Sequence, residues 1–524
     1  MLIHKPTRTV VLEGIDPTVP TFISHAKQLV FKGKPLTVVP HGLDETLMLR
    51  NLGYEVPSPI EHHFDWTGPF HPYRHQVETA AFLTLNRRAF VFNGLGSGKT
   101  YSAIEAAEFL MREGVIRKVL ILCCLSTVTP TWGNELFTHV MHRSTRYLIG
   151  TAAQRLKRLG EDADYYIMNH DGLRTERLCK AIAERDDIDL IIVDEASLYR
   201  NARSQRYKAL QGVIGNRRMW LMTATPCPKD PTDAWALARL VDPKRVPSHF
   251  TQWRDMTMRQ VTTFKWVPKD NALELAFNAM QPAIRFRTED CIDLPDRVFM
   301  MRRAPLSDAQ AKAYGAMRNY MAAEMEGSVI TAANAGVALM KLVQIACGVV
   351  RTGEDDNVLE FEDVPRLGAL LEAVEEVEAD AKIIVFAPFK ALLPMISAAL
   401  EKEGYTTAIV SGATPKKERD VIFHDFQHGK NPHVLVAHPA CMSHGLTLTA
   451  ANTTIWYAPL TNSEIVEQAN ARTYRNGQKR TTRVLELYST PEEKRLYDIV
   501  KGRHELSGSL MDLYKQVVEG VDLE

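Results

Sequence analysis

The stretch Ala89-Phe90-Val91-Phe92-Asn93-Gly94-Leu95-Gly96-Ser97-Gly98-Lys99-Thr100 decides the fold. It opens with a short apolar run, which predicts a strand buried on both faces. Three glycines follow, and a helical pattern begins after Thr100. Phosphates need many convergent backbone N–H donors, and glycines leave room for their close approach. The order strand, glycine loop, helix therefore predicts a phosphate-binding loop, to which the helix N-terminus adds its dipole.

Two side chains of this loop have expected roles. Lys99 would reach the β- and γ-phosphates of a nucleotide, and the Thr100 hydroxyl would ligate Mg²⁺. The strict pattern has Gly where this chain has Asn93. A glycine turn beside an incidental lysine is the alternative interpretation, and the order of strand, glycines, Lys-Thr and helix argues against it.

A second candidate motif is the pair of carboxylates that follows the apolar run Leu190–Val193. Asp194 is expected to hold the shell of a magnesium ion, and Glu195 to polarise the attacking water. In isolation, Asp-Glu after a strand is usually a charge pair at a helix N-terminus. Downstream of a phosphate loop, the catalytic interpretation is favoured.

Apolar runs alternate with helical patterns along most of the chain, which predicts parallel α/β layers. One helix is expected after Thr100, with Gly114 as its stop, and another over Pro415–His428. The region around 246–350 has mainly helical patterns, and 353–363 has the composition of a linker. The expected strands fall into two series: residues 89–92, 119–125, 165–168, 190–193 and 220–222, and then 382–386, 408–410, 434–437, 454–457 and 484–488.

Composition excludes several classes of protein. The 524 residues carry 63 basic and 63 acidic side chains, so no supercharged tail indicates a nucleic-acid partner, although a one-sided basic cleft is compatible with a balanced total. The seven cysteines form no C-x-x-C pair, which argues against a disulfide framework or structural zinc. The longest apolar runs are far shorter than a membrane span, and the N-terminus lacks the apolar core of a signal peptide. We expect a soluble, cytoplasmic protein.

Further motifs lie on either side of these two. Phe70-His71-Pro72-Tyr73-Arg74-His75-Gln76 precedes the phosphate loop, and Thr223-Ala224-Thr225-Pro226 follows the strand expected at 220–222. Near the end comes Gln468-Ala469-Asn470-Ala471-Arg472-Thr473-Tyr474-Arg475-Asn476-Gly477-Gln478. Taken together, from about Phe70 to Leu487, the motifs resemble those of superfamily 2 helicase-like ATPases, most closely the Swi/Snf-type double-stranded DNA translocases. The compact length resembles phage or bacterial members.

The resemblance implies an α/β fold with two RecA-like parallel-sheet motor lobes, helical insertions and a small N-terminal accessory domain. The implied boundaries are 1–66 for the accessory domain, 67–245 for the first lobe and 246–355 for the insertions. The second lobe would span 356–490, and 491–524 would form a C-terminal helical brace. Residues 1–66 would bind duplex or junction DNA, or serve as a packing cap; the sequence leaves both interpretations open.

The resemblance also assigns roles to residues. Gln76 would hydrogen-bond the adenine edge, with Tyr73 or Arg74 packed on its face. The segment from Ser126 to Glu135, which includes Trp132, is similar to the first DNA-contact segment of the family. Ser197 stands where the family usually has His, and Thr447 replaces a usual Asn. The residues implied in DNA contact or coupling are Thr127, Asn169, Thr223, Thr225, Ser443 and Gly445.

The closing motif would supply arginine fingers. Arg472 and Arg475 are three residues apart, so a helix would place both on one face, with Gln468 nearby. A guanidinium fork carries a permanent charge that matches γ-phosphate oxygens. A solvated basic helix is the alternative that this segment would suggest without the other motifs.

The implied function is an ATP-dependent DNA translocase or helicase that remodels branched DNA or displaces bound proteins. Its cofactors would be ATP and Mg²⁺, and its partner would be double-stranded or branched DNA. The protein would be a monomer in the cytoplasm, which is the host cytoplasm if a phage encodes it. A strand-separating DNA or RNA helicase and a non-hydrolysing nucleic-acid clamp are the alternatives.

Overall fold

The computed structural model describes residues 1–66, 68–224, 230–261, 266–287, 291, 294–327, 332–352, 357–378, 380–442, 446–475 and 477–502. The chain divides into two compact units. The first comprises residues 1–227, 231–258 and 269–291, and the second comprises residues 228–230, 259–268 and 292–524. Of the predicted site residues, Thr225, Ser443 and Gly445 lie outside the described residues, as do 503–524 of the predicted C-terminal brace.

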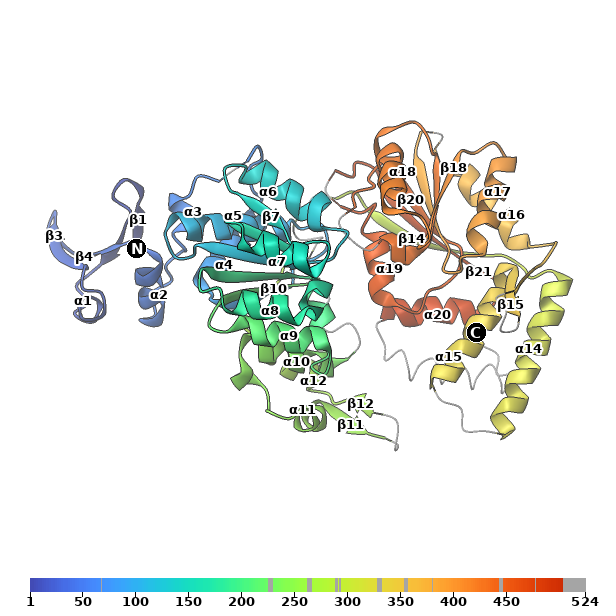
Figure 1. Cartoon of the computed structure of the whole chain (residues 1–524), viewed down its shortest axis with the longest axis horizontal. Helices are drawn as coiled ribbons and strands as arrows, with labels where there is room; N and C mark the ends of the chain where they lie inside the picture. The colour runs from blue at the N-terminus through green and yellow to red at the C-terminus, as the bar shows by residue number, and fades with distance from the viewer. Residues whose placement is uncertain are drawn as a thin grey trace. The chain divides into compact units, whose positions relative to one another are not determined.

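A seven-stranded parallel sheet forms the centre of the first unit, in the order β13-β5-β10-β9-β6-β8-β7 (Figure 1). Its strands are β5 (Arg88–Val91), β6 (Lys118–Cys123), β7 (Thr145–Tyr147), β8 (Tyr165–Asn169), β9 (Ile188–Asp194), β10 (Arg218–Met222) and β13 (Ala283–Ile284). Alternate residues enter opposite cores: Ile191 and Val193 pack on one face, and Leu190 and Ile192 on the other. This double burial explains the continuous apolar runs.

Nine helices accompany this sheet within the described residues of the unit. They are α4 (Arg74–Leu85), α5 (Lys99–Arg112), α6 (Asn134–His139), α7 (Ala152–Gly160), α8 (Glu176–Ala183), α9 (Gln205–Ile214), α10 (Ala234–Val241), α11 (Phe250–Thr257) and α12 (Ala272–Ala279). Helix α5 carries the predicted apolar face and ends at Arg112, followed by Gly114 with a φ of 71°.

The second unit contains a six-stranded parallel sheet in the order β14-β21-β20-β17-β19-β18. The strands are β14 (Arg297–Arg303), β17 (Lys382–Phe386), β18 (Thr407–Val410), β19 (Val434–Ala437), β20 (Ala451–Trp456) and β21 (Thr482–Tyr488). Its helices are α14 (Asp308–Gly327), α15 (Ala332–Cys347), α16 (Pro365–Glu375), α17 (Leu392–Lys402), α18 (Lys416–His428), α19 (Ser463–Asn470) and α20 (Pro491–Gly502). Two parallel sheets with helices confirm the predicted α/β class and its two RecA-like lobes.

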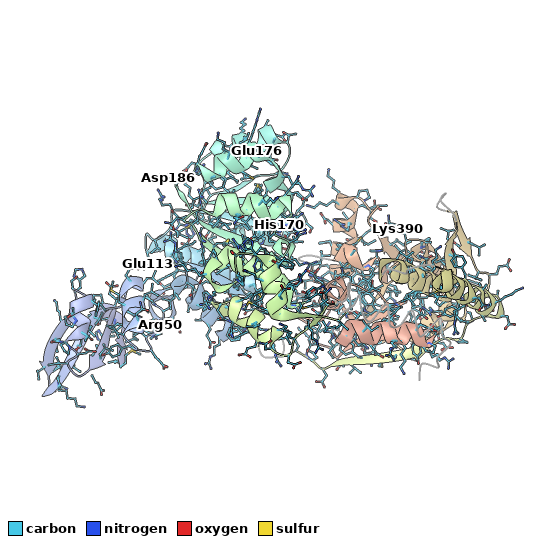
Figure 2. All side chains as sticks on the ribbon, turned by 90° about the horizontal axis from the view of Figure 1, so that it is seen from below. Arg50, Glu113, His170, Glu176, Asp186 and Lys390 are labelled. Carbon is cyan, nitrogen blue, oxygen red and sulfur yellow. The ribbon has the colours of Figure 1, made fainter. Side chains whose placement is uncertain are left out.

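A separate small core forms the N-terminal domain, drawn in blue in Figure 1. Its antiparallel sheet has the order β1-β2-β4-β3, from β1 (Leu2–His4), β2 (Thr9–Glu13), β3 (Lys27–Phe31) and β4 (Lys34–Pro40). Its helices are α1 (Thr18–Phe22) and α2 (Leu43–Asn51), and α3 (Ile60–His63) follows, with Ile60 packed in the core of the first large sheet. Arg8 pairs with Glu113 at 2.9 Å, and the hydroxyls of Ser58 and Thr84 are 2.8 Å apart. Figure 2 shows Glu113 where this domain meets the first sheet's helices.

Four details differ from the predictions. Residues Asn357–Glu360, predicted as linker, form β16, which pairs with β15 (Val349–Thr352) because its apolar Val358 and Leu359 suit a strand. Pro415 is the N-cap of α18, not its first residue. The segment predicted as insertions contributes β13 to the first sheet and β14 to the second. Helix α19 ends at Asn470, before both arginines of the closing motif.

Among the described residues, no helix combines the length and the apolar composition that crossing a membrane requires.

Candidate functional site

The glycine loop joins β5 to α5 as the sequence predicts. Gly96 and Gly98 have φ values of 77° and 78°, in the left-handed region that favours glycine. The Lys99 ammonium donates to the carbonyl oxygens of Asn93 and Gly94, both at 2.9 Å. The lysine therefore lies against the loop itself, and the first turn of α5, with Thr100 as its second residue, faces the same region.

Asn93, the departure from the strict loop pattern, is a buried anchor. Its side-chain nitrogen donates to the Thr79 hydroxyl on α4 at 2.8 Å, and its side-chain oxygen accepts from the backbone N–H of Phe286 at 3.1 Å. The N–H of Gly94 donates to the Phe286 carbonyl at 2.8 Å. Asn93 thus joins the loop to α4 and to the segment after β13, a role that glycine could not fill.

The segment before α4 contacts the same loop. Gln76 accepts from the Tyr73 N–H at 3.0 Å and donates to the Ser97 carbonyl at 3.3 Å. A Cβ on Gly98 would come within 2.1 Å of the Gln76 side-chain nitrogen, so a side chain there would displace the Gln76 amide from the loop. Arg74, by contrast, is largely exposed and pairs with Glu78 at 2.7 Å.

His75, on the first turn of α4, also contacts the glycine loop, and the sequence did not single it out. Its Nε2 lies 2.8 Å from the Ser97 carbonyl oxygen, and its ring stacks on that of Tyr73 with centroids 5.7 Å apart. A carbonyl only accepts, so Nε2 carries the proton. The position of a histidine one residue before Gln76 was the available signal.

Asp194 is the last residue of β9. Trp132, which follows β6, and Lys99, which follows β5, both act on its carboxyl group. The indole N–H of the fully buried Trp132, after β6, donates to its Oδ2 at 3.0 Å. Burial raises the pKa of the Asp194 carboxyl, while the Trp132 hydrogen bond and the Lys99 charge lower it. The structure therefore brings the predicted lysine and aspartate into one electrostatic environment.

Glu195 is held in an unusual backbone conformation. Its φ is 57°, one of three positive values among the described non-glycine residues. Its Oε1 accepts from the Ser197 hydroxyl at 2.9 Å and from the Thr223 hydroxyl at 3.2 Å. Two donors on one oxygen fix the orientation of this carboxylate.

Thr223 owes its position to the strand order. Strand β10 lies between β5 and β9, with Met222 paired to both Val91 and Asp194. The Thr223 N–H donates to the Val91 carbonyl at 3.0 Å. This residue therefore lies between the strand that leads to the phosphate loop and the strand that leads to the two carboxylates.

Two predicted DNA-contact residues of this unit, Thr127 and Asn169, are buried. The Thr127 hydroxyl donates to the Cys124 carbonyl at 2.9 Å. Asn169 ends β8, and its side-chain oxygen has no hydrogen-bond partner among the residues that the structure describes. The indole of Trp132, in the segment predicted to contact DNA, faces Asp194 instead, because its ring is fully buried.

In the second unit, Arg472 and Arg475 lie in turns after α19, so the prediction that a helix aligns them is wrong. Both nevertheless converge on one atom: their guanidinium groups donate to the Leu446 carbonyl, at 3.2 Å and 2.7 Å. Arg472 also donates to the backbone carbonyl of Gln468 at 2.9 Å. Arg472 and Gln468 are buried, and Arg475 is more exposed.

Gln478 holds this arginine segment in place. Its side-chain nitrogen donates to the carbonyls of Thr449, Ala451 and Thr473, at 3.3, 2.9 and 3.0 Å. Its side-chain oxygen accepts from the N–H groups of Lys479 and Arg480, each at 3.0 Å. The closing glutamine of the motif is therefore structural, and it ties the arginine turns to the edge of β20.

The first unit therefore gathers, at the carboxyl ends of neighbouring strands, a glycine loop, a lysine, a partly buried aspartate and an oriented glutamate. These are the groups that phosphoryl transfer from a nucleoside triphosphate requires. The second unit carries two guanidinium groups on one turn, the side chains suited to phosphate oxygens.

Comparisons with known proteins agree with this geometry. Residues 75–348 match the SNF2-related domain, and residues 365–477 match the helicase conserved C-terminal domain. The chain is 26% identical to an uncharacterized ATP-dependent helicase of Mycoplasma genitalium over 60% of its own length and 30% of that protein. It is 25% identical to protein p41 of Acyrthosiphon pisum secondary endosymbiont phage 1, over 72% of this chain and 82% of the relative.

A solved structure, the Sulfolobus solfataricus SWI2/SNF2 ATPase core in complex with dsDNA, aligns with a TM-score of 0.42 at 20% identity, over 87% of this chain and 98% of that one. The SNF2-related match alone spans more than half of the 524 residues. The chain therefore belongs to the SNF2-related family and carries both domains of a helicase-type ATPase.

Proposed function

We propose that this protein hydrolyses ATP to translocate along duplex DNA, and thereby remodels branched DNA or displaces bound proteins. The observation that carries the proposal is the single cluster formed by Lys99, Asp194 and Glu195, with Ser197 and Thr223 fixing the glutamate. Family membership and the converging arginines of the second unit support it.

The phosphate loop would receive the β- and γ-phosphates. Lys99 now donates to two neutral carbonyls, and phosphate oxygens are stronger acceptors because the hydrogen bond is charge-assisted on both sides. Gln76 and Tyr73, adjacent to the loop, would contact the base. Arg74, exposed and paired with Glu78, is the weaker of the three predicted base contacts.

A magnesium ion fits the oxygen donors of this site. Thr100 and Asp194 would hold it, since Mg²⁺ prefers carboxylate and hydroxyl oxygens together with substrate phosphates. The ion would supply neutralisation of the negative charge that develops on the phosphates. Burial raises the pKa of Asp194, and the charge of Lys99 opposes that rise, as a bound cation would also do.

Glu195 would orient the attacking water. Its Oε1 is occupied by Ser197 and Thr223, which leaves Oε2 to accept a hydrogen bond from a water aligned with the γ-phosphorus. The second unit would add Arg475, the more exposed arginine, while Arg472 and Gln468 hold its turn. Groups of both units would contact the γ-phosphate, so loss of that phosphate would weaken the closed state of the two lobes. The difference between the ATP and ADP states would then drive a conformational cycle.

DNA would be held mainly through its phosphate backbone by Thr127, Asn169, Ser443 and Gly445 and their neighbouring amides, and Thr223 and Thr225 would couple the DNA site to the ATP site. Backbone contacts carry little sequence information, so binding should be sequence-independent and weakened by salt. The buried positions of Thr127 and Asn169 imply that backbone groups of their loops make the contact. A monomer is the simplest state for one such ATP site.

The test is steady-state ATP hydrolysis with blunt duplex, single strand, fork, four-way junction and RNA. Stimulation by blunt duplex is expected, with loss of turnover in Lys99→Ala and Glu195→Gln. Stimulation restricted to single strands or RNA would instead identify a strand-separating helicase, and binding of ATP without turnover would identify a clamp. Displacement of a triplex-forming strand from a duplex then separates translocation from stationary hydrolysis.

A further inference from the structure

The N-terminal domain ends in an exposed hairpin. Strand β3 is the edge of its sheet and pairs only with β4, and every residue of Lys27–Phe31 is exposed. Lys32 and Gly33 form the two-residue turn with φ values of 50° and 77°, the backbone of a tight hairpin. Val30 and Phe31 at the tip retain 67% and 58% of their accessible surface.

One face of this hairpin continues an uncovered sheet face. The register places Lys27 opposite Val38, Leu29 opposite Leu36 and Phe31 opposite Lys34. The other face carries Thr37 and Val39, which are buried in the domain core. Because side chains alternate along a strand, Leu29, Phe31, Lys27 and Lys34 all point away from that core.

The charge of the hairpin has one sign. From Asp16 to Asp44 the sequence holds no acidic residue between them, yet it holds Lys27, Lys32 and Lys34. Within the described part of the chain none of these three lysines forms a salt bridge, and Lys32 lies over the Phe31 ring at 5.5 Å. The hairpin thus combines three unneutralised ammonium groups with exposed apolar side chains.

We propose that this hairpin binds the phosphate backbone of the DNA on which the motor acts, as a contact separate from the ATP-site lobe. The assignment rests on the proposed function, which supplies the polyanion. Lysines would neutralise phosphates, and Phe31, on the same face as Lys27 and Lys34, would pack on sugars or base edges. A second copy of the chain is disfavoured as occupant, because edge-to-edge pairing would bring like-charged lysines together.

The experiment measures affinity of the full-length chain for a blunt duplex, without nucleotide, between 50 and 200 mM salt. Each phosphate contact contributes about 0.9 to the slope of log affinity against log salt, so losing three should reduce the slope by about 2.7. The test variant is Lys27→Ala/Lys32→Ala/Lys34→Ala. The ratio of wild-type to variant affinity should therefore be about fortyfold smaller at 200 mM salt than at 50 mM salt.

Two controls separate this effect from net charge and from folding. The variant Lys157→Ala/Lys180→Ala/Lys402→Ala removes the same charge from exposed helical positions and should leave the slope unchanged. The variant Lys27→Arg/Lys32→Arg/Lys34→Arg should retain the wild-type slope. Unfolding temperature verifies that each variant is folded.

Two outcomes are distinct. If the hairpin variant keeps the wild-type slope while duplex still stimulates ATP hydrolysis, the hairpin does not bind DNA and this proposal is overturned, although the motor function stands. If duplex fails to stimulate hydrolysis by the wild type, the proposed function fails on its own; a reduced slope in the variant would then still establish the hairpin contact.

Discussion

The Ser197 hydroxyl donates a hydrogen bond to Glu195 Oε1 at 2.9 Å, and this contact lies beside the most strained backbone of the site. Ser197 is the fourth residue of the motif Asp194-Glu195-Ala196-Ser197. Thr223 donates to the same oxygen at 3.2 Å. The glutamate that would orient water is thus held by one residue of its own motif and by one residue of the neighbouring strand.

The first prediction concerns these two donors. Ser197→Ala should lower kcat about tenfold with little change in KM for ATP, since one hydrogen bond to a charged group contributes about 1.5 kcal/mol. Steady-state kinetics of Ser197→Ala, Thr223→Ala and the double variant measure the effect. The two losses should be non-additive because both act on one atom; strictly multiplicative losses would show that they act independently.

The second prediction concerns Trp132, which the sequence did not connect to catalysis. Trp132→Phe removes the hydrogen-bond donor to Asp194. ATP turnover by the folded variant should therefore be lower than that by the folded wild type. The matched control is Trp220→Phe, another fully buried tryptophan of the same unit, whose indole donates to the Asn86 carbonyl at 3.2 Å. Equal turnover in the two folded variants would contradict a role for the Trp132 contact.

The third prediction concerns Asn93. Asn93→Gly restores the strict loop pattern, yet it should destabilise the protein by about 1–3 kcal/mol, because the Phe286 N–H loses its acceptor. Denaturant unfolding measures the change. Asn93→Asp keeps the shape and that acceptor but adds negative charge beside the phosphates, so it should chiefly raise KM for ATP. A glycine variant as stable as wild type would refute the anchoring role.

The fourth prediction concerns pH. His41 Nε2 donates to the Pro57 carbonyl at 3.0 Å, so a neutral His41 accepts from His63 through Nδ1, at 2.9 Å. Burial, with the nearby His41 and Arg8, lowers the pKa of His63 from 6.5 to about 4. The unfolded chain therefore takes up a proton before the folded one does, and stability should fall as pH drops from about 6.5 towards 4.

His63→Asn should weaken this pH dependence, and denaturant unfolding at several pH values between 7.5 and 4.5 measures it. His25→Asn, at an exposed position of the same domain, is the control. An identical pH profile in His63→Asn and wild type would show that His63 does not couple protonation to folding.

Local pattern was enough to predict the two parallel sheets. Strands β17 and β19 have the predicted bounds, because continuous apolar runs between turn residues correspond to strands buried on both faces. The phosphate loop was equally local, since its glycines and Lys99 are contiguous. The N-terminal domain was not classified, because its short strands reveal their pairing only through the hairpin register.

The connections within the site could not be predicted, because they join residues far apart in sequence. Trp132 reaches Asp194 across 62 positions, and Phe286 reaches Asn93 across 193. The two arginines of the closing motif show a different kind of error. Their spacing suggested one face of a helix, but α19 ends at Asn470, before both residues. Their guanidinium groups instead both donate to the Leu446 carbonyl. The prediction of a shared helical face is therefore wrong, and the role of the two arginines stays a prediction.

The central claim is that ATP hydrolysis needs groups from both units. The most direct measurement is the ATPase rate of Arg475→Ala at saturating duplex and ATP, beside Arg302→Ala, which removes another arginine of the second unit that pairs with Glu376. Removal of an arginine finger should lower kcat about a thousandfold while nucleotide binding persists, with Arg302→Ala near wild type. Hydrolysis by Arg475→Ala at the wild-type rate would contradict the account.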